Sequence, residues 1–148
     1  HHATTPYNLA YSTTTILNTD GTALAIWNAG VSGSYYIVIQ SRNGVTTWSA
    51  NPVNISSGST SYDFTTDENK AYGSNQVQLS AGIFAFYSGD LNKDENIDLL
   101  DIAMIESDIN NFQFGYFATD INGDGNVDLL DIPNVENNIN SFIFSNHP

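Results

Sequence analysis

Two acidic stretches, thirty residues apart, carry the side chains that could do chemistry. The later stretch, "DINGDGNVDLLD" (120–131), has carboxylate or amide side chains at its first, third, fifth, seventh, ninth and twelfth positions, and "DLNKDENIDLLD" (90–101) repeats this spacing. Oxygen ligands at this spacing are typical of a twelve-residue calcium loop, whose seventh residue offers its backbone carbonyl. Gly125 fills the sixth position, where the loop turns sharply and glycine adopts a positive φ at little cost. The sequence therefore predicts two calcium loops.

Each loop leads into a segment with helical periodicity. A shift of thirty residues places 90–116 over 120–146 with fourteen identities in twenty-seven positions. Asp98 and Asp128 are the predicted N-caps, and Asp101 and Asp131 stand three residues later. We expect two loop–helix repeats that bury apolar stripes against each other. The predicted stripes are Ile102, Ile105, Ile109 and Phe112 in the first repeat, and Ile132, Val135, Ile139 and Phe142 in the second.

Charge and composition exclude several function classes. The net charge is −13, and residues 90–148 account for −11 of it, with twelve acids and one base. So acidic a surface repels nucleic acid and anionic membranes, whereas two calcium ions would cancel four of the negative charges. The chain has no cysteine, which excludes disulfides and thiolate metal sites. We expect no membrane insertion, because no apolar run approaches the roughly 20 residues that a span needs.

Residues 11–87 have the pattern of short strands separated by frequent turns. Asp20-Gly21 lies between two apolar runs of "ILNTDGTALAIW" (16–27), and Asn43-Gly44 does the same in "SYYIVIQSRNGVTTWS" (34–49). Both dipeptides favour hairpins. Further strands are expected at 53–55, 60–64, 75–80 and 82–88, with a polar loop at 65–74. Strands this short favour a small antiparallel β-sandwich of the immunoglobulin or fibronectin kind.

The loops are entered without a preceding helix, unlike those of an ordinary EF-hand. The extended "IFAFYSG" precedes the first loop, and the glycine-broken "FQFGYFAT" precedes the second. Over 90–144 the chain resembles the dockerin module of secreted bacterial proteins, whose duplicated unit is a calcium loop with its exiting helix. "SGSYYIVIQSRNGVTTWSANPV" and "YDFTTDENKAYGSNQ" also resemble a β-module fused to dockerin-like C-termini. The expected fold is therefore mixed: a mainly β sandwich over 1–88, then a small α calcium-binding module over 89–148.

The resemblance implies a ligand set for each of two calcium ions. The first would have side-chain ligands from Asp90, Asn92, Asp94, Asp98 and Asp101 and the carbonyl of Asn96. The second would have Asp120, Asn122, Asp124, Asp128 and Asp131 and the carbonyl of Asn126. Two positions depart from the pattern. Glu95 replaces glycine at the sixth position of the first loop, which is expected to strain it, and Pro133 is expected to delay or bend the second helix.

The resemblance also indicates where a partner would bind. In dockerins the tenth and eleventh loop positions usually contact the cohesin partner and are often small hydroxyl residues. Here both copies have leucine pairs: Leu99 and Leu100, then Leu129 and Leu130. One interpretation is a duplicated hydrophobic docking surface; the other is that these leucines pack inward.

We therefore expect a non-catalytic, calcium-binding C-terminal segment of a larger secreted protein. It would dock its parent to a cohesin-like partner at the cell surface or in an extracellular assembly. In one alternative the chain is a structural subunit that self-assembles, its sandwich lacking an edge strand that a neighbouring strand supplies. In another it binds polysaccharide on an aromatic platform formed by Tyr35, Tyr36, Trp48 and Tyr62, with calcium as a clip.

An enzyme is not expected from the residues present. Glu106 and Glu136 occupy equivalent positions of the two repeats and are expected on solvated helix faces, and the three histidines lie near the termini without evident partners. No set of nucleophile, base and orienting residue is evident.

Overall fold

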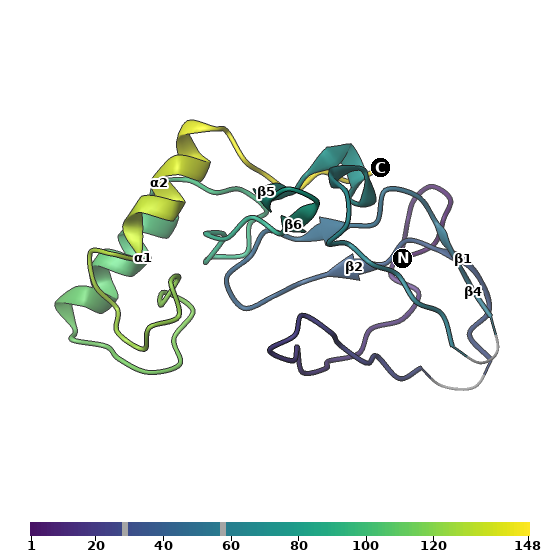
Figure 1. Cartoon of the computed structure of the whole chain (residues 1–148), viewed down its shortest axis with the longest axis horizontal. Coiled ribbons are helices and arrows are strands. Elements are labelled where there is room, and N and C mark those ends of the chain that lie inside the picture. Colours follow the sequence, from purple (N-terminus) through teal and green to yellow (C-terminus); the bar gives the residue numbers. More distant parts are fainter. Residues whose placement is uncertain (28–29, 57–58) are drawn as a thin grey trace.

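Short antiparallel strand pairs make up the first half of the chain, and two helices lie side by side in the second (Figure 1). The computed structural model describes residues 1–27, 30–56 and 59–148. In these residues the strands are β1 (Gly33–Tyr35), β2 (Val38–Ile39), β3 (Thr47–Trp48), β4 (Val53–Ile55), β5 (Val77–Ser80) and β6 (Ile83–Ala85). The helices are α1 (Leu99–Asn110) and α2 (Ile132–Asn140), and two short 3-10 helices, η1 (Glu68–Lys70) and η2 (Tyr72–Ser74), precede β5.

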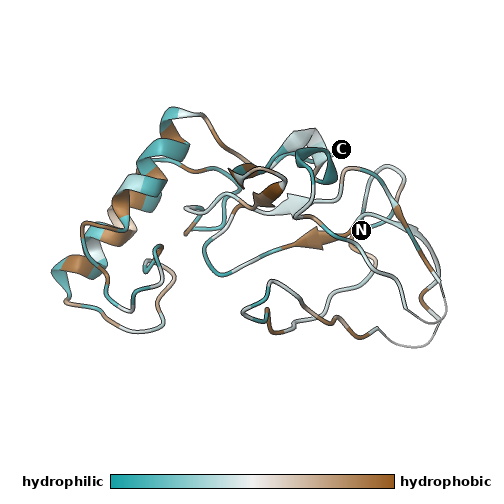
Figure 2. Cartoon of the chain, in the orientation of Figure 1, coloured by the Kyte–Doolittle hydropathy of each residue, from teal (hydrophilic) through white to brown (hydrophobic). Residues whose placement is uncertain are grey.

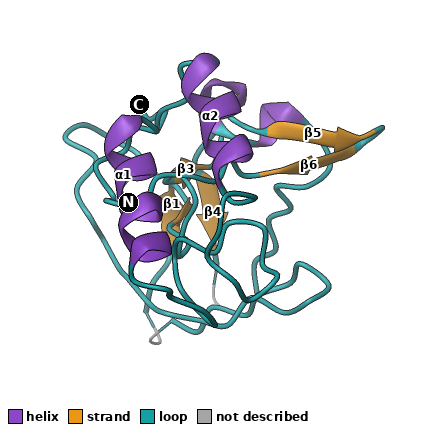
Figure 3. Ribbon diagram, turned by 90° about the vertical axis from the view of Figure 1, so that its left-hand side faces the viewer, coloured by secondary structure: helices purple, strands orange, loops and turns teal. Residues whose placement is uncertain are grey.

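The strands pair in twos. Within the described residues the sheets are β1–β4, β2–β3 and β5–β6, all antiparallel. Figure 3 shows β5 and β6 side by side. The β2–β3 hairpin, with Val38 opposite Trp48, confirms that the chain reverses around Asn43-Gly44, but a seven-residue connection, 40–46, replaces a tight two-residue turn. The strand expected before that turn is divided, because β1 pairs with β4 and β2 with β3. The backbone of Tyr36, between them, exchanges two hydrogen bonds with His1, each 2.9 Å long.

The β-sandwich expected over 1–88 is not what the described residues form. The turn at Asp20-Gly21 does form, with the Asn18 N–H donating to the Thr22 carbonyl at 2.8 Å. Among the described residues its two arms pair through the single bridge Leu17 to Ala23 and form no strand. The aliphatic side chains of this hairpin, Ile16, Leu17, Leu24 and Ile26, are 67–80% exposed. A turn dipeptide fixes only the local chain direction, whereas a sandwich needs a second sheet over the apolar face. The strand predicted at 60–64 is likewise absent from the structure, and η1 and η2 occupy the predicted loop at 65–74.

The helical half follows the repeat, with one shift and one correction. The repeat equivalent of Leu99, where α1 begins, is Leu129, but α2 begins three residues later at Ile132, with Pro133 in its first turn. This confirms the expected effect of proline, which is tolerated only at the start of a helix. Hydrophobic and hydrophilic residues alternate along both helices (Figure 2).

Phe112 and Phe142 do not extend the apolar stripes, contrary to the prediction. Both helices have ended, at Asn110 and Asn140, and both phenylalanines adopt a left-handed φ of 54° and 53°. Their side chains are 86% and 83% exposed. The chain turns back at these residues, as it does in common helix C-terminal turns, so the 3.6-residue period no longer applies.

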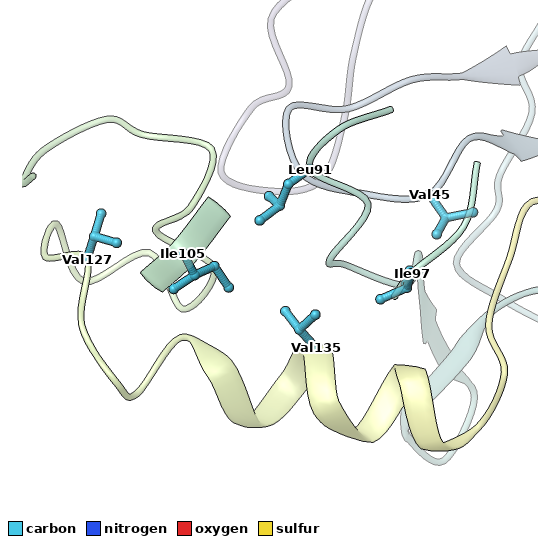
Figure 4. Packing of buried hydrophobic residues seen from close by; sticks show 6 residues of the cluster. All are labelled: Val45, Leu91, Ile97, Ile105, Val127 and Val135. Carbon is cyan, nitrogen blue, oxygen red and sulfur yellow. The ribbon is translucent and has the colours of Figure 1, made fainter. Parts of the chain in front are cut away.

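The principal hydrophobic cluster joins the two halves of the chain. Ile105 of α1 and Val135 of α2 are fully buried, and Val45 joins them from the connection between β2 and β3 (Figure 4). The other buried members are Leu91, Ile97 and Val127, all from the acidic loops. Gly89 lets the chain pass close to this cluster, since it has a φ of 122° and a Cβ there would lie 3.0 Å from Ile97. Packing therefore crosses the predicted boundary between residues 88 and 89.

A shared cluster predicts a single cooperative unfolding transition. Ile105→Ala should lower the free energy of unfolding by about 3 kcal/mol, because it removes fully buried methylene and methyl groups and leaves a cavity. Leu100→Ala, at an exposed position of the same helix, is the control and should change it little. Denaturation followed by tryptophan fluorescence and by helical circular dichroism should give coincident curves. Separate transitions would contradict the shared core.

Candidate metal centre

Each acidic loop is closed by the carboxylate at its twelfth position. Asp101 is fully buried, and its Oδ1 accepts the N–H groups of Leu91 at 2.7 Å and Asn92 at 3.2 Å. Its Oδ2 accepts the N–H of Asp98 at 2.9 Å, which completes a capping box at the start of α1. One side chain therefore ties the start of the loop to the start of its helix.

The second loop repeats this arrangement. Asp131 is fully buried and accepts from Ile121 at 2.8 Å, Asn122 at 3.1 Å and Asp128 at 2.9 Å. The Asp98 and Asp128 carboxylates each accept the N–H group two residues later at 2.8 Å. This confirms Asp98 as the N-cap of α1. The prediction of Asp128 as a helix N-cap is wrong, because α2 begins at Ile132 and its N-cap is Asp131, which makes no side-chain cap hydrogen bond.

The third and fifth positions are oriented by local hydrogen bonds. The side-chain oxygens of Asn92 and Asn122 accept the N–H groups of Asp94 and Asp124 at 2.9 and 2.8 Å. Asp94 and Asp124 in turn accept the N–H groups at the seventh position, at 3.0 and 2.8 Å. These backbone hydrogen bonds hold the pKa of both aspartates below its usual range, so both remain carboxylates in mildly acidic solution.

The first position distinguishes the two loops. Asp120 accepts the N–H groups of Gly123 at 2.8 Å and Gly125 at 3.1 Å. Asp90 is fully buried, and neither of its carboxylate oxygens has a hydrogen-bond partner among the residues that the structure describes. Burial raises the pKa of Asp90, while the charge of Lys93 opposes the rise.

A hard cation fits this arrangement. A buried carboxylate without a partner is costly, and a divalent ion binding oxygen would satisfy it. No group of three or more His, Cys, Asp or Glu side chains gathers as a metal cluster in the described ranges. Each implied set contains four aspartates and two asparagines, so its four carboxylates do not converge as such a cluster in this structure.

The sixth position takes a left-handed conformation in both loops. Gly125 has a φ of 87°, as predicted, and Glu95 adopts a φ of 74° in the first loop. For a residue with a Cβ, this left-handed conformation costs about 1–2 kcal/mol. The expected strain at Glu95 is therefore present in the backbone.

The segment after each helix returns to the opposite loop. The N–H of Val127 donates to the Gln113 carbonyl at 3.3 Å, and the N–H of Ile97 donates to the Ile143 carbonyl at 3.2 Å. Sequence reasoning missed this exchange. The sequence feature that could have revealed it is the continuation of the repeat past both helices, where "NFQF" (111–114) aligns with "SFIF" (141–144).

The four leucines at the tenth and eleventh loop positions lie on the surface. Leu99, Leu100, Leu129 and Leu130 are 62–72% exposed. The interpretation that these leucines pack inward is therefore wrong.

The aromatic residues pack together instead of forming an open platform. Trp48 is only 7% exposed, and the rings of His1 and His147 lie 4.5 and 5.7 Å from it. The Tyr62 hydroxyl donates to the Lys70 carbonyl at 2.6 Å. The histidines thus have partners that the sequence did not reveal, and His147 also lies 3.6 Å from Glu95. Glu106 and Glu136 are exposed on their helices, as expected.

Comparison with known protein families gives a match within the acidic half of the chain. Residues 88–140 match the family model of the dockerin type I domain. Neither the curated proteins nor the solved structures contain a match to the chain. No helix in the described part of the chain is long and apolar enough to cross a membrane. The match supports a dockerin-like module over residues 88–140, and dockerin domains are calcium-dependent protein-docking modules.

Proposed function

We propose that the chain is a calcium-dependent docking segment of a secreted protein. The observation that carries the proposal is the pair of repeated loops whose oxygens are already oriented, with the buried Asp90 carboxylate lacking a partner in the described residues. The proposed ligands of the first ion are Asp90, Asn92, Asp94, Asn96 through its carbonyl, Asp98 and Asp101. Those of the second are Asp120, Asn122, Asp124, Asn126 through its carbonyl, Asp128 and Asp131.

Calcium contributes charge neutralisation and a cross-link between parts of one loop. The protein residues fix the shape of each loop. Asp101 and Asp131 bind the backbone at the loop ends. The asparagine at the third position accepts the N–H of the aspartate at the fifth. The leucines, carried beside the loops at the helix starts, form the proposed docking face. The carboxylates around them favour a partner with an apolar groove and a basic rim. The proposed location is the cell surface or the extracellular medium.

A second candidate is a self-assembling structural subunit. It is supported by the exposed apolar residues of the hairpin at 16–27, such as Ile16, Leu24 and Ile26, which a strand from another chain could cover. Polysaccharide binding receives no comparable support, since Trp48 is buried beneath the terminal histidines.

Removal of calcium should lower the stability of the chain. An ion that binds only the folded state stabilises it by RT ln(1 + [L]/Kd), about 2.7 kcal/mol per site at 100 times Kd. The melting temperature should therefore fall in excess EDTA and recover when calcium is added back. Magnesium at the same ionic strength is the control for screening. An unchanged melt in EDTA would refute calcium binding as proposed.

The second loop should bind calcium more tightly than the first. Glu95 disfavours the sixth-position conformation by about 1–2 kcal/mol, which corresponds to roughly tenfold in affinity. In calorimetric titrations Asp120→Ala should abolish the tighter event and Asp90→Ala the weaker one. Glu95→Gly should bring the two affinities closer together. Loss of the tighter event in Asp90→Ala would show that the glycine is not decisive.

The leucine pairs should be needed for docking but not for folding. An immobilised chain should retain a cohesin domain in calcium and release it in EDTA. Replacing all four leucines by alanine should weaken retention at least tenfold, since several buried leucine contacts of about 1 kcal/mol or more are lost. Leu79→Ala, at an exposed position of β5, is the control. Retention that survives the fourfold replacement would exclude this face, and retention of the chain by itself would favour the second candidate.

A further inference from the structure

In each loop a basic side chain donates a hydrogen bond to the carbonyl of the first peptide group. In the first loop the Lys93 Nζ donates to the Asp90 carbonyl at 2.6 Å, and the N–H of the same peptide, from Leu91, donates to Asp101. In the second loop the Arg42 guanidinium donates to the Asp120 carbonyl at 3.3 Å, and the N–H of that peptide, from Ile121, donates to Asp131. Both loops therefore have the same chain of contacts: a cation, a peptide group and the closing carboxylate.

The two cations reach these equivalent places from different parts of the chain. Lys93 is the fourth residue of its own loop, and the fourth residue of the second loop is Gly123, which has no side chain to offer. Arg42 comes from the turn between β2 and β3, seventy-eight residues earlier in the chain. The chain has three lysines and arginines in all, so two of the three serve the loops.

Contacts of its side chain and of the turn that carries it hold Arg42 beside the second loop. Its guanidinium lies 4.1 Å from the centre of the Tyr116 ring, a cation–π distance. The turn that carries it is fixed by the Gly89 N–H, which donates to the Asn43 carbonyl at 2.6 Å, and by Lys93, whose Nζ also donates to the Gly44 carbonyl at 2.9 Å. The turn at 42–44 thus contacts the entrance of both loops.

We propose that Arg42 is a positioning residue of the second calcium loop, supplied by the β2–β3 hairpin in place of the lysine that the first loop carries itself. By fixing the Asp120–Ile121 peptide, it orients the N–H group that holds the closing carboxylate Asp131. Arg42 lies outside residues 88–140, so the second site extends beyond the dockerin-like module. The inference rests on calcium binding as proposed above.

Two effects of Arg42 on calcium have opposite signs, which makes the proposal testable. A positive charge near the site repels a cation, so loss of charge alone would tighten binding. Loss of an orienting partner outside the ligand shell typically weakens metal binding by about 10–100-fold. The proposal requires the second effect to exceed the first.

The test is a calcium titration by nuclear magnetic resonance, with the backbone amides of Gly125 and Glu95 reporting the second and first loops. In Arg42→Ala the half-saturating calcium concentration at Gly125 should rise about 10–100-fold, while that at Glu95 stays unchanged. Lys70→Ala removes a positive charge away from the loops and should leave both values as they are. Unchanged or tighter binding at Gly125 in Arg42→Ala would overturn the proposal.

A rescue variant tests the equivalence of the two cations. Gly123→Lys in the Arg42→Ala background should restore most of the lost affinity, because a Cβ at Gly123 meets nothing within 4 Å. Lys93 already adopts a φ of 62° at the equivalent position, and Gly123 has 77°. Gly123→Lys alone measures the cost of that conformation. If calcium affinity of the second loop is not restored after the cost of Gly123→Lys is subtracted, Lys93 and Arg42 do not play equivalent roles.

Two outcomes keep the inference separate from the proposed function. If neither Gly125 nor Glu95 responds to calcium in the unmodified chain, calcium binding itself fails. If Arg42→Ala does not fold, Arg42→Met makes the same comparison, since it keeps a long unbranched side chain but loses the charge and the hydrogen-bond donor. Weaker binding at Gly125 alone is then expected, and equal binding would again count against Arg42.

Discussion

The burial of two carboxylates, Asp101 and Asp131, is the constraint on which the helical half depends. A fully buried carboxylate is costly unless donors surround it, and each of these accepts three backbone N–H groups. The donors lie at both ends of one loop, so the loop cannot open without exposing or stranding the charge. The same side chains fix the residues from which α1 and α2 continue, and the helices then bring Ile105 and Val135 into contact in the core.

The net charge is unevenly distributed along the chain. Residues 90–148, which contain both acidic loops, carry −11 of the net charge of −13. Lys93 and Arg42 each donate to a backbone carbonyl of a loop. Their positive charges therefore lie near the loops without occupying the space between the carboxylates. In the proposed function a calcium ion would bridge the carboxylates directly, as their hard oxygen ligands favour.

The sequence predicted what neighbouring residues decide. The loop hydrogen bonds, the Asp98 cap and the late start of α2 depend on residues within a dozen positions, and duplication made their pattern plain. The positions of Phe112 and Phe142 beyond the helices could not be predicted in this way, because periodicity does not show where a helix ends. The left-handed residue at each helix end is also a phenylalanine, where glycine is usual. The sandwich failed for another reason: the turns at Asp20-Gly21 and Asn43-Gly44 are local, but the choice of β4 as the partner of β1 is not. Arg42, which has no partner within its own hairpin pattern, could not have been assigned to a loop so distant in sequence.

The boundary that composition indicates at residue 89 is not a boundary in packing. Val45 lies in the helical core, and the chain after α2 returns to the hairpin, where the Ser145 hydroxyl donates to the Thr46 carbonyl at 2.7 Å. The Asn75 side chain donates to the Phe144 carbonyl at 2.8 Å, which fastens the same returning segment from the other side. A hinge between two parts requires few contacts across it, whereas here the hydrogen bonds lie on both sides of the junction. The face that carries Leu99 and Leu129 is therefore fixed in direction relative to β2 and β3, so whatever binds it is held at a set angle to the rest of the chain.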